Sequence, residues 1–313
     1  MLKNDNSKRM IRKYRCTSHI IAVLYSLSNI DEFASYFINS NENNKIIEQL
    51  KDIFKFILYR NNQNEEIRGK KNEEGILVYD KATFMDFVKN ICKDEEDYMN
   101  EQEPYKFYKS LLEEIKDKKE VYQLFEGEID KEILCDFKNC KIFKGKKEFI
   151  YIEIYVNPDS ISGTKIEENL KKIIIEEHLK KDYIPNQFCE KCKKENLFTE
   201  SKNISTFPKI LVFRIVWGFE EDEDKLKYKF DQEEFSINVN TSEKKFKLIS
   251  SINYYKKDDK KDEKIHYISK NRKKKGDGTQ DIWEFAWDND VPKKFDNYED
   301  KITIPYLLFY KLE

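Results

Sequence analysis

Glycine and proline are scarce in this chain, which has 8 glycines and 6 prolines among 313 residues. A typical protein contains about 7% glycine. The sequence has neither an internal repeat nor a Pro/Gly-rich linker. Its length suits one large multi-lobed domain or two ordinary ones, and no linker of this kind separates two domains.

Long apolar runs are also missing. No stretch approaches the roughly 18 apolar residues that a membrane-spanning helix requires, and the polar segment Met1–Arg12 has no signal-peptide core. We therefore expect no membrane association and a reducing environment in the cytoplasm, the nucleus or both. In such an environment the six cysteines favour metal binding or catalysis over disulfides.

The chain has no excess of charge of one sign, since 58 Lys and Arg oppose 60 Asp and Glu and the net charge is −2. Bulk charge therefore gives no indication of a direct nucleic-acid partner. What the sequence does contain is aromatic: 22 Phe and 19 Tyr residues. A disordered chain would share the charge but not these aromatics, so we expect a folded protein with a heavily charged surface.

The pattern along the chain divides into three stretches. The first, to about residue 120, is predicted to be helical, because apolar residues from Ser18 to Leu27 have the spacing of a buried helix. Further helices are expected over Asn44–Tyr59, Lys81–Cys92 and Pro104–Lys116. The second stretch, to about residue 245, is expected to combine strands, a cysteine-bearing insertion and a short helix over Ile166–Leu179.

The predicted strands are rich in β-branched and aromatic residues. Two of them, Lys147–Val156 and Lys209–Trp217, lie in the second stretch. The third stretch contains the others, which are Phe246–Asn253, Lys264–Lys270, Ile282–Trp287 and Ile304–Lys311. A helical lobe followed by an antiparallel lobe predicts an α+β fold.

Four of the cysteines form two close pairs. Cys135 and Cys140 are separated by four residues, and Cys189 and Cys192 by two. Two short hairpins can each offer two thiolates to one tetrahedral Zn²⁺, with bonds of about 2.3 Å, and four thiolates leave no open coordination position. The pattern therefore predicts a structural zinc site. The alternative is four unrelated core or surface cysteines, which the wider spacing of the first pair leaves open.

Several further segments carry a resemblance to a known family. They are Gln102–Phe107, Phe207–Arg214, His266 with Tyr267, Trp283 with Val291, and Pro305–Tyr310. In this order they resemble the helix start Q-D-A-x-E-F, the strand P-x-x-L-x-x-x-x-R-F, the G-H-Y box, the W-x-x-F-D-D-x-x-V box and the closing strand of the ubiquitin-specific proteases, a family of cysteine deubiquitinases. The cysteine pairs fall where the zinc-binding fingers of that family lie.

The resemblance implies a single papain-like α+β domain over residues 1–313. Its parts would be a helical thumb (about 1–120), zinc-bearing β fingers (about 130–205 and 217–240) and an antiparallel β palm (about 121–130, 206–216 and 241–313). It implies Zn²⁺ as a structural cofactor of the four paired cysteines. It also implies ubiquitin or a ubiquitin-like protein as a partner, within a larger complex if the domain serves as a scaffold.

The family chemistry needs a thiolate nucleophile, a His base and an Asp or Asn that orients the His. The segment Ala22–Ile30 resembles the family helix S-V-L-Q-C-L-S-N-I, and counting back from it places Ser18 at the nucleophile position. Lys13 then corresponds to the oxyanion-stabilising Asn. A serine hydroxyl is not acidified as a thiol is, so the resemblance implies a lost nucleophile.

The same comparison places His266 at the base position and Trp287 at the orienting position. An indole cannot accept a hydrogen bond from His. Ile265 replaces the glycine that leaves room for the Gly-Gly tail of ubiquitin in the family. These departures predict a pseudo-deubiquitinase without peptidase activity, which binds ubiquitin or acts as a scaffold.

The alternative is an active cysteine deubiquitinase that cleaves ubiquitin C-terminal peptide and isopeptide bonds. In this interpretation Cys16 is the nucleophile, after a shift of two residues before the helix, and Asp288 orients His266. The distance between Cys16 and His266, and then activity, distinguish the two interpretations.

Overall fold

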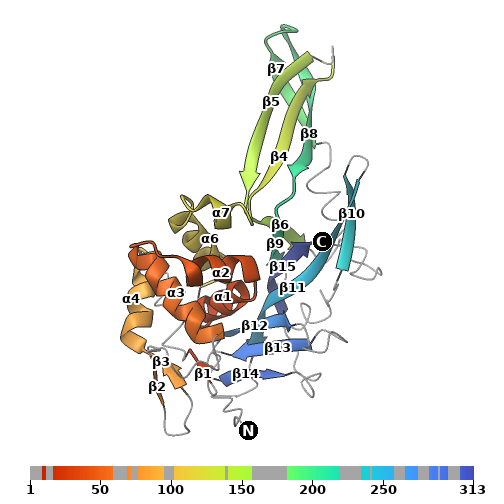
Figure 1. Ribbon diagram of the computed structural model, residues 1–313. Coiled ribbons are helices and arrows are strands. Elements are labelled where there is room, and N and C mark those ends of the chain that lie inside the picture. Colours follow the sequence, from red (N-terminus) through yellow and green to blue (C-terminus); the bar gives the residue numbers. More distant parts are fainter. Residues whose placement is uncertain are drawn as a thin grey trace. The chain divides into compact units, whose positions relative to one another are not determined.

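The structure is a computed structural model that describes residues 9–11, 17–58, 69–71, 77–94, 102–137, 140–156, 182–218, 234–239, 242–256, 265–273, 282–287, 290–294 and 304–313. It divides into two compact units, Met1–Tyr122 with Leu248–Phe309, and Gln123–Lys247 with Tyr310–Glu313. The division falls within two long strands, β11 (Ser242–Lys256) and β15 (Ile304–Leu312). Helices and largely antiparallel sheets are both present, which confirms the α+β class (Figure 1).

The first unit contains the described helices. They are α1 (Ser18–Ser28), α2 (Asp31–Asn39), α3 (Lys45–Leu58), α4 (Lys81–Ile91), α6 (Pro104–Glu114) and α7 (Lys119–Tyr122). Every residue of α1 is buried, as expected for a helix without a polar face. The helices α2 and α3 pack through aromatic side chains, with the rings of Phe33 and Phe37 5.0 Å apart and that of Phe54 5.9 Å from both.

Strands of the first unit follow the order β14 (Asp290–Lys294), β13 (Ile282–Trp287), β12 (Ile265–Lys273), β11 and β15. A smaller sheet has the order β1 (Arg9–Met10), β3 (Leu77–Tyr79), β2 (Gly69–Lys71). Helix α1 packs on β12 through polar groups: the hydroxyls of Ser26 and Ser269 lie 2.9 Å apart, and both serines are fully buried.

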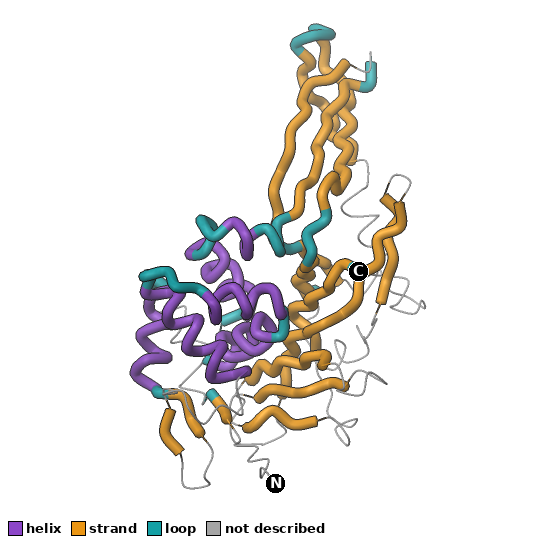
Figure 2. Tube along the Cα trace, viewed as in Figure 1, coloured by secondary structure: helices purple, strands orange, loops and turns teal. Residues whose placement is uncertain are grey.

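The second unit contains a four-stranded sheet of order β5 (Cys140–Phe149), β4 (Gly127–Cys135), β8 (Lys194–Thr206), β7 (Asp182–Cys189). Figure 2 shows these strands as one long ladder with turns at one end. In the same unit, β6 (Ile152–Val156) pairs in parallel with β9 (Ile210–Trp217), and β10 (Glu234–Val239) pairs with the start of β11. Phe213, Phe235 and Tyr310 pack edge to face or tilted within it.

One predicted strand is wrong. The apolar run Lys147–Val156 contains the end of β5 and all of β6, which pair with different strands in different sheets. The run of Phe, Ile and Tyr residues continues through the bend at Ile150, and hydrophobicity does not encode a change of pairing partner. The helix predicted over Ile166–Leu179 lies outside the described residues, and the three-lobe division stays a prediction.

Candidate active site and metal centre

Helix α1 begins at Ser18, the residue that the sequence places at the nucleophile position. Ser18 is 1% exposed, and its hydroxyl makes no hydrogen bond to any described residue. A helix N-terminus concentrates backbone N–H groups and partial positive charge, which favours an anion such as a thiolate. Ser18 therefore places a hydroxyl where the partial positive charge of the helix N-terminus would stabilise a thiolate.

The remaining predicted catalytic residues are described in part. His266 is the second residue of β12, opposite Tyr255, and Trp287 ends β13, opposite Asp290. For these two the structure describes the backbone. Lys13, Cys16 and Asp288 lie outside the described residues.

The first residues of α1 and the first residues of β12 lie at the same end of the contact between these two elements. Ser26 of α1 meets Ser269, and Asn29, one turn later, donates to the carbonyl of Arg272 at 3.2 Å. The two elements therefore run in the same direction. Standard rises place Ser18 about 12 Å before Ser26, and His266 about 10 Å before Ser269. A nucleophile at the start of α1 and a base at the start of β12 would therefore lie at the same end of this contact. The catalytic assignments stay predictions.

Three of the four predicted metal ligands come together. The sulfur atoms of Cys135, Cys189 and Cys192 lie within 4.8 Å of one another, and those of Cys135 and Cys192 are 3.7 Å apart. Sulfurs bound tetrahedrally at about 2.3 Å from one Zn²⁺ would be about 3.8 Å apart. The separation of the Cys135 and Cys192 sulfurs therefore matches that of two ligands of one metal ion. Cys140 lies opposite Cys135 in the register of β4 and β5, so its backbone is beside the cluster.

The turn between β7 and β8 is shaped for a thiolate. The N–H of Cys192 donates to the sulfur of Cys189 at 3.4 Å, and the N–H of Lys193 donates to the carbonyl of Cys189 at 2.7 Å. Lys193 closes the turn with φ 55°, a left-handed conformation that is uncommon for residues other than glycine. Because these bonds favour a charged sulfur and a fixed turn, they support metal binding. The sequence pattern gave no sign that a lysine would take this conformation.

The cluster is also shielded from water. Cys135 and Cys189 are buried and pack against Phe198, with Ile133 and Ile184 beside them. Exclusion of water strengthens the attraction between thiolates and a cation. The three described cysteines are therefore able to hold a metal ion, and Cys140 as fourth ligand stays a prediction.

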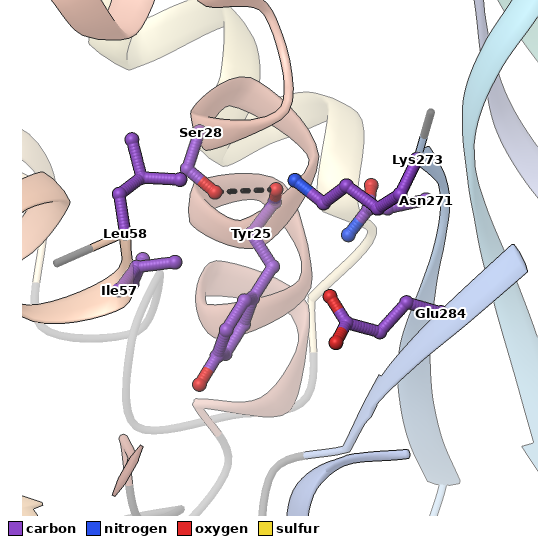
Figure 3. A pocket seen from close by; sticks show the side chains of 7 residues that line it. All are labelled: Tyr25, Ser28, Ile57, Leu58, Asn271, Lys273 and Glu284. Carbon is purple, nitrogen blue, oxygen red and sulfur yellow. Dashed lines mark hydrogen bonds between the residues drawn. The ribbon is translucent and has the colours of Figure 1, made fainter. Parts of the chain in front are cut away.

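A polar pocket of about 260 Å³ lies in the first unit, between α1, the end of α3, β12 and β13 (Figure 3). Its lining consists of Tyr25, Ser28, Ile57, Leu58, Asn271, Lys273 and Glu284. The hydroxyl of Ser28 donates to the carbonyl of Tyr25 at 2.8 Å, so it is satisfied within α1. Tyr25 lies seven residues after Ser18, about 10 Å along the helix. The pocket therefore does not contain the predicted nucleophile position.

Comparison with known proteins gives a consistent result. Residues 11–280 match the family described as ubiquitin carboxyl-terminal hydrolase. No curated protein matches the chain. The fold is similar to that of the Saccharomyces cerevisiae PAN2 pseudoubiquitin-hydrolase, with a TM-score of 0.66 and 13% identity over 98% of this chain and 86% of that one.

Two further structures share the fold. The SAGA DUB module that contains Ubp8 and is bound to monoubiquitin has a TM-score of 0.67 and 16% identity, covering 100% of this chain and 70% of that one. The Saccharomyces cerevisiae apo Pan2 pseudoubiquitin hydrolase-RNA exonuclease module in complex with A7 RNA has a TM-score of 0.70 and 12% identity, covering 99% and 55%.

The described helices and largely antiparallel sheets have the α+β fold of these ubiquitin-hydrolase structures. The chain belongs to the ubiquitin carboxyl-terminal hydrolase family, of the ubiquitin-specific protease type. The resemblance found in the sequence is thereby confirmed. Among the described residues, no helix is both long and apolar enough to span a bilayer.

Proposed function

We propose that this chain is a catalytically inactive ubiquitin hydrolase that binds ubiquitin or a ubiquitin-like protein. The observation that carries the proposal is that α1 begins at Ser18. The nucleophile of a cysteine hydrolase gains acidity from a helix N-terminus, and here that position holds a buried serine. A serine hydroxyl needs an adjacent base to act, and without one it is a weak nucleophile.

Two other positions support inactivity. Ile265, the first residue of β12, stands where the family has a glycine before its catalytic His, and a branched side chain there would narrow a channel for the ubiquitin tail. Trp287 ends β13 where the family orients that His with Asp or Asn. An indole only donates hydrogen bonds, so it would leave the imidazole of His266 without its orienting acceptor.

A separate observation supports the proposal that the chain still binds ubiquitin. Of the structures with the same fold, one is called a pseudoubiquitin-hydrolase and another holds monoubiquitin. Loss of chemistry and recognition of ubiquitin are both represented among proteins of this fold. A scaffold role in a multiprotein complex, without ubiquitin binding, is the outcome that a failed titration would favour.

We also propose that Cys135, Cys140, Cys189 and Cys192 hold a structural Zn²⁺. The 3.7 Å separation of two sulfurs supports this ligand set. When bound, the ion would supply a rigid cross-link between β4, β5 and the turn that joins β7 to β8, with no open position for chemistry. The chain's own contribution is the turn at Lys193 and the apolar cover of Phe198.

The first experiment tests the active centre. The purified chain would be incubated with ubiquitin that carries a thiol-reactive C-terminal warhead, and its intact mass recorded. We expect no adduct with the natural sequence. An adduct that disappears in Cys16→Ala would show that Cys16 is a working nucleophile, and the inactive assignment would be wrong.

A gain-of-function variant tests the position itself. In Ser18→Cys combined with Ile265→Gly, a thiol stands at the start of α1 and the tail channel is widened. We expect this variant to form the adduct, whereas it should still fail to hydrolyse a fluorogenic ubiquitin substrate because Trp287 remains. Absence of the adduct in a folded variant would mean that the ubiquitin tail does not reach α1.

Binding is tested independently of chemistry. Isotope-labelled ubiquitin would be titrated with the natural chain and its amide resonances followed by NMR. We expect saturable shifts that persist in Cys16→Ala. No shift at high micromolar concentrations of folded, metal-loaded chain would remove ubiquitin as the partner and leave the scaffold role.

A further inference from the structure

The four-stranded sheet of the second unit has two terminal strands, β5 and β7. In an antiparallel pair, every second residue of an edge strand directs its N–H and C=O groups away from its partner. Strand β7 contains Pro185, which has no N–H, and its pairing with β8 shifts between Ile184 and Gln187. Proline and irregular pairing protect an edge from another strand, whereas β5 contains no proline over its ten residues.

The edge of β5 that pairs with no described strand is basic. It has four lysines and one glutamate, and the sequence from Cys140 reads CKIFKGKKEF. Lys146 pairs with Glu128 of β4 at 2.8 Å. Lys144 and Lys147 are exposed and form no ion pair with any described residue. Like charges would repel a second copy of the same edge, so the strand is protected against itself and complementary to an acidic segment.

Strand β5 also carries an exposed apolar side chain. The side chain of Phe143 is 47% exposed, one of the few large apolar groups that the described surface displays. Its ring lies against Gly145, where a Cβ atom would come within 2.5 Å of the ring. The glycine therefore allows the ring to lie over Gly145, where an added strand could place an apolar side chain against it.

We propose that the edge of β5 binds an extended acidic segment of a partner protein as an added β-strand. Main-chain hydrogen bonds would supply affinity, and the pattern of Phe143 beside exposed lysines would select a segment in which acidic and apolar residues alternate. The proposal does not depend on ubiquitin binding, because its ligand is an extended peptide and not a folded domain.

The test uses a fluorescein-labelled ten-residue peptide of alternating Glu and Val, titrated with the whole chain and followed by fluorescence anisotropy. We expect saturable binding that weakens about tenfold or more in Lys144→Glu with Lys147→Glu, because two attractive charges become repulsive. The matched control is Lys106→Glu with Lys109→Glu, which makes the same charge change on the exposed face of α6. We expect the control to bind as the natural chain does.

A second pair of measurements separates strand addition from charge. Phe143→Ser keeps every lysine and should also weaken binding, with circular dichroism and metal content unchanged. The same peptide with every backbone amide methylated keeps its charges but loses its N–H donors, and it should not bind. Equal binding of the methylated peptide, or an equal loss in the α6 control, would overturn the proposal.

The chain's own acidic run Glu220–Asp224, which lies outside the described residues, provides a competing outcome. Its acidic residues would be replaced by Ser and the titration repeated. We expect the affinity to stay within about twofold of the natural chain. Binding that appears only in this variant would mean that the edge is occupied by the chain itself, and the proposed partner would be wrong.

Discussion

The contact between α1 and β12 includes a hydrogen-bonded pair of buried hydroxyls. Ser26 and Ser269 are each fully buried and lie 2.9 Å apart. Removing one hydroxyl leaves the other buried without its partner, which costs about 1–3 kcal/mol, whereas replacing both can be nearly neutral. We therefore expect Ser26→Ala and Ser269→Ala each to destabilise the protein, and the double variant to cost less than their sum.

Urea unfolding of the four proteins in this cycle measures the coupling between the two hydroxyls. Because they are in direct contact, an interaction energy of about 0.5 kcal/mol or more is expected. Strictly additive effects would show that the hydrogen bond is replaced by water in each single variant, and that the contact does not contribute to stability as the geometry suggests.

Asp86 of α4 gives a prediction about pH. Its carboxylate accepts hydrogen bonds from Lys45 at 3.2 Å and Gln49 at 2.8 Å, and the bond from Lys45 is the main cause of a pKa below the ordinary value of 3.8. A lowered pKa stabilises the folded state above the ordinary pKa, and this contribution is lost as pH falls through the folded value. The group is half exposed, so a contribution of at most about 1 kcal/mol is reasonable.

The measurement is the difference in unfolding free energy between the natural chain and Asp86→Asn, recorded from pH 7 down to pH 3. We expect the natural chain to be more stable near pH 7 and the difference to shrink below about pH 4, where the carboxylate is protonated. A difference that grows on acidification would contradict the assigned sign. Asp52→Asn, at another carboxylate that lines the same surface as Asp86, Lys45 and Gln49, is the control.

At the scale of single elements, α4 has a well-formed N-cap. A carboxylate oxygen of Asp80 accepts from the N–H of Thr83 at 2.9 Å and from its hydroxyl at 2.9 Å. Loss of such a cap costs about 1 kcal/mol. Asp80→Ala should therefore lower the urea midpoint without changing the slope, and Asp80→Asn, which can still cap, should recover most of the loss. Equal losses in both would mean that the charge matters and the cap does not.

Helices that bury a continuous set of side chains were predicted closely, for a physical reason. The segments expected over Ser18–Leu27 and Lys81–Cys92 correspond to α1 and α4 within one residue at each end, because each buries a continuous set of side chains. Helix α2 was not anticipated, since it begins two residues after Asn29, the C-cap of α1, with no glycine or proline to mark the boundary.

The strands of the four-stranded sheet were not located individually. Strand β8 (Lys194–Thr206) is polar along most of its length and has exposed residues throughout. A sheet with both faces largely solvated gives no alternation of apolar and polar residues. Its pairing instead uses ion pairs such as Lys131–Glu200 at 2.9 Å, which involve residues 69 positions apart. No local pattern contains that information.

The candidate sites were also predicted only in part. The spacing of the cysteines was sufficient to predict three residues whose sulfur atoms lie close together, because each close pair belongs to one turn. It could not supply Phe198, which covers the cluster from a neighbouring strand. The nucleophile position was predicted by counting back from an apolar helix pattern, and α1 does begin there, whereas the side chains of the base and the orienting residue remain predictions.

At the scale of the whole molecule, the two units are expected to respond differently to loss of the metal. The first unit has a dense aromatic core, which includes Phe33, Phe54 and Phe107, each 2% exposed or less. The four-stranded sheet has a small buried cluster in which Cys135, Cys189 and Phe198 are the buried members. A small apolar cluster contributes little on its own, so a metal cross-link would supply a large share of local stability.

We therefore expect chelation to act locally. After treatment with a strong zinc chelator, amide hydrogen exchange should accelerate in β4, β5, β7 and β8, while α1 and β12 keep their protection. Cys192→Ser should produce the same pattern without chelator, because a neutral hydroxyl is a poor ligand for Zn²⁺, whereas Cys92→Ser, on a buried cysteine outside the cluster, should not.

Two other outcomes of the exchange experiment would contradict a local effect of the metal. If β4, β5, β7 and β8 kept full protection after the metal had been removed, the apolar contacts of Phe198 and the cross-strand ion pairs would be sufficient to hold the sheet, and the cysteines would be a dispensable reinforcement. If α1 lost protection together with the sheet, the two units would fold as one cooperative body. Only accelerated exchange that is confined to the four strands is consistent with a metal that stabilises this sheet alone, while the core of the first unit is stable without it.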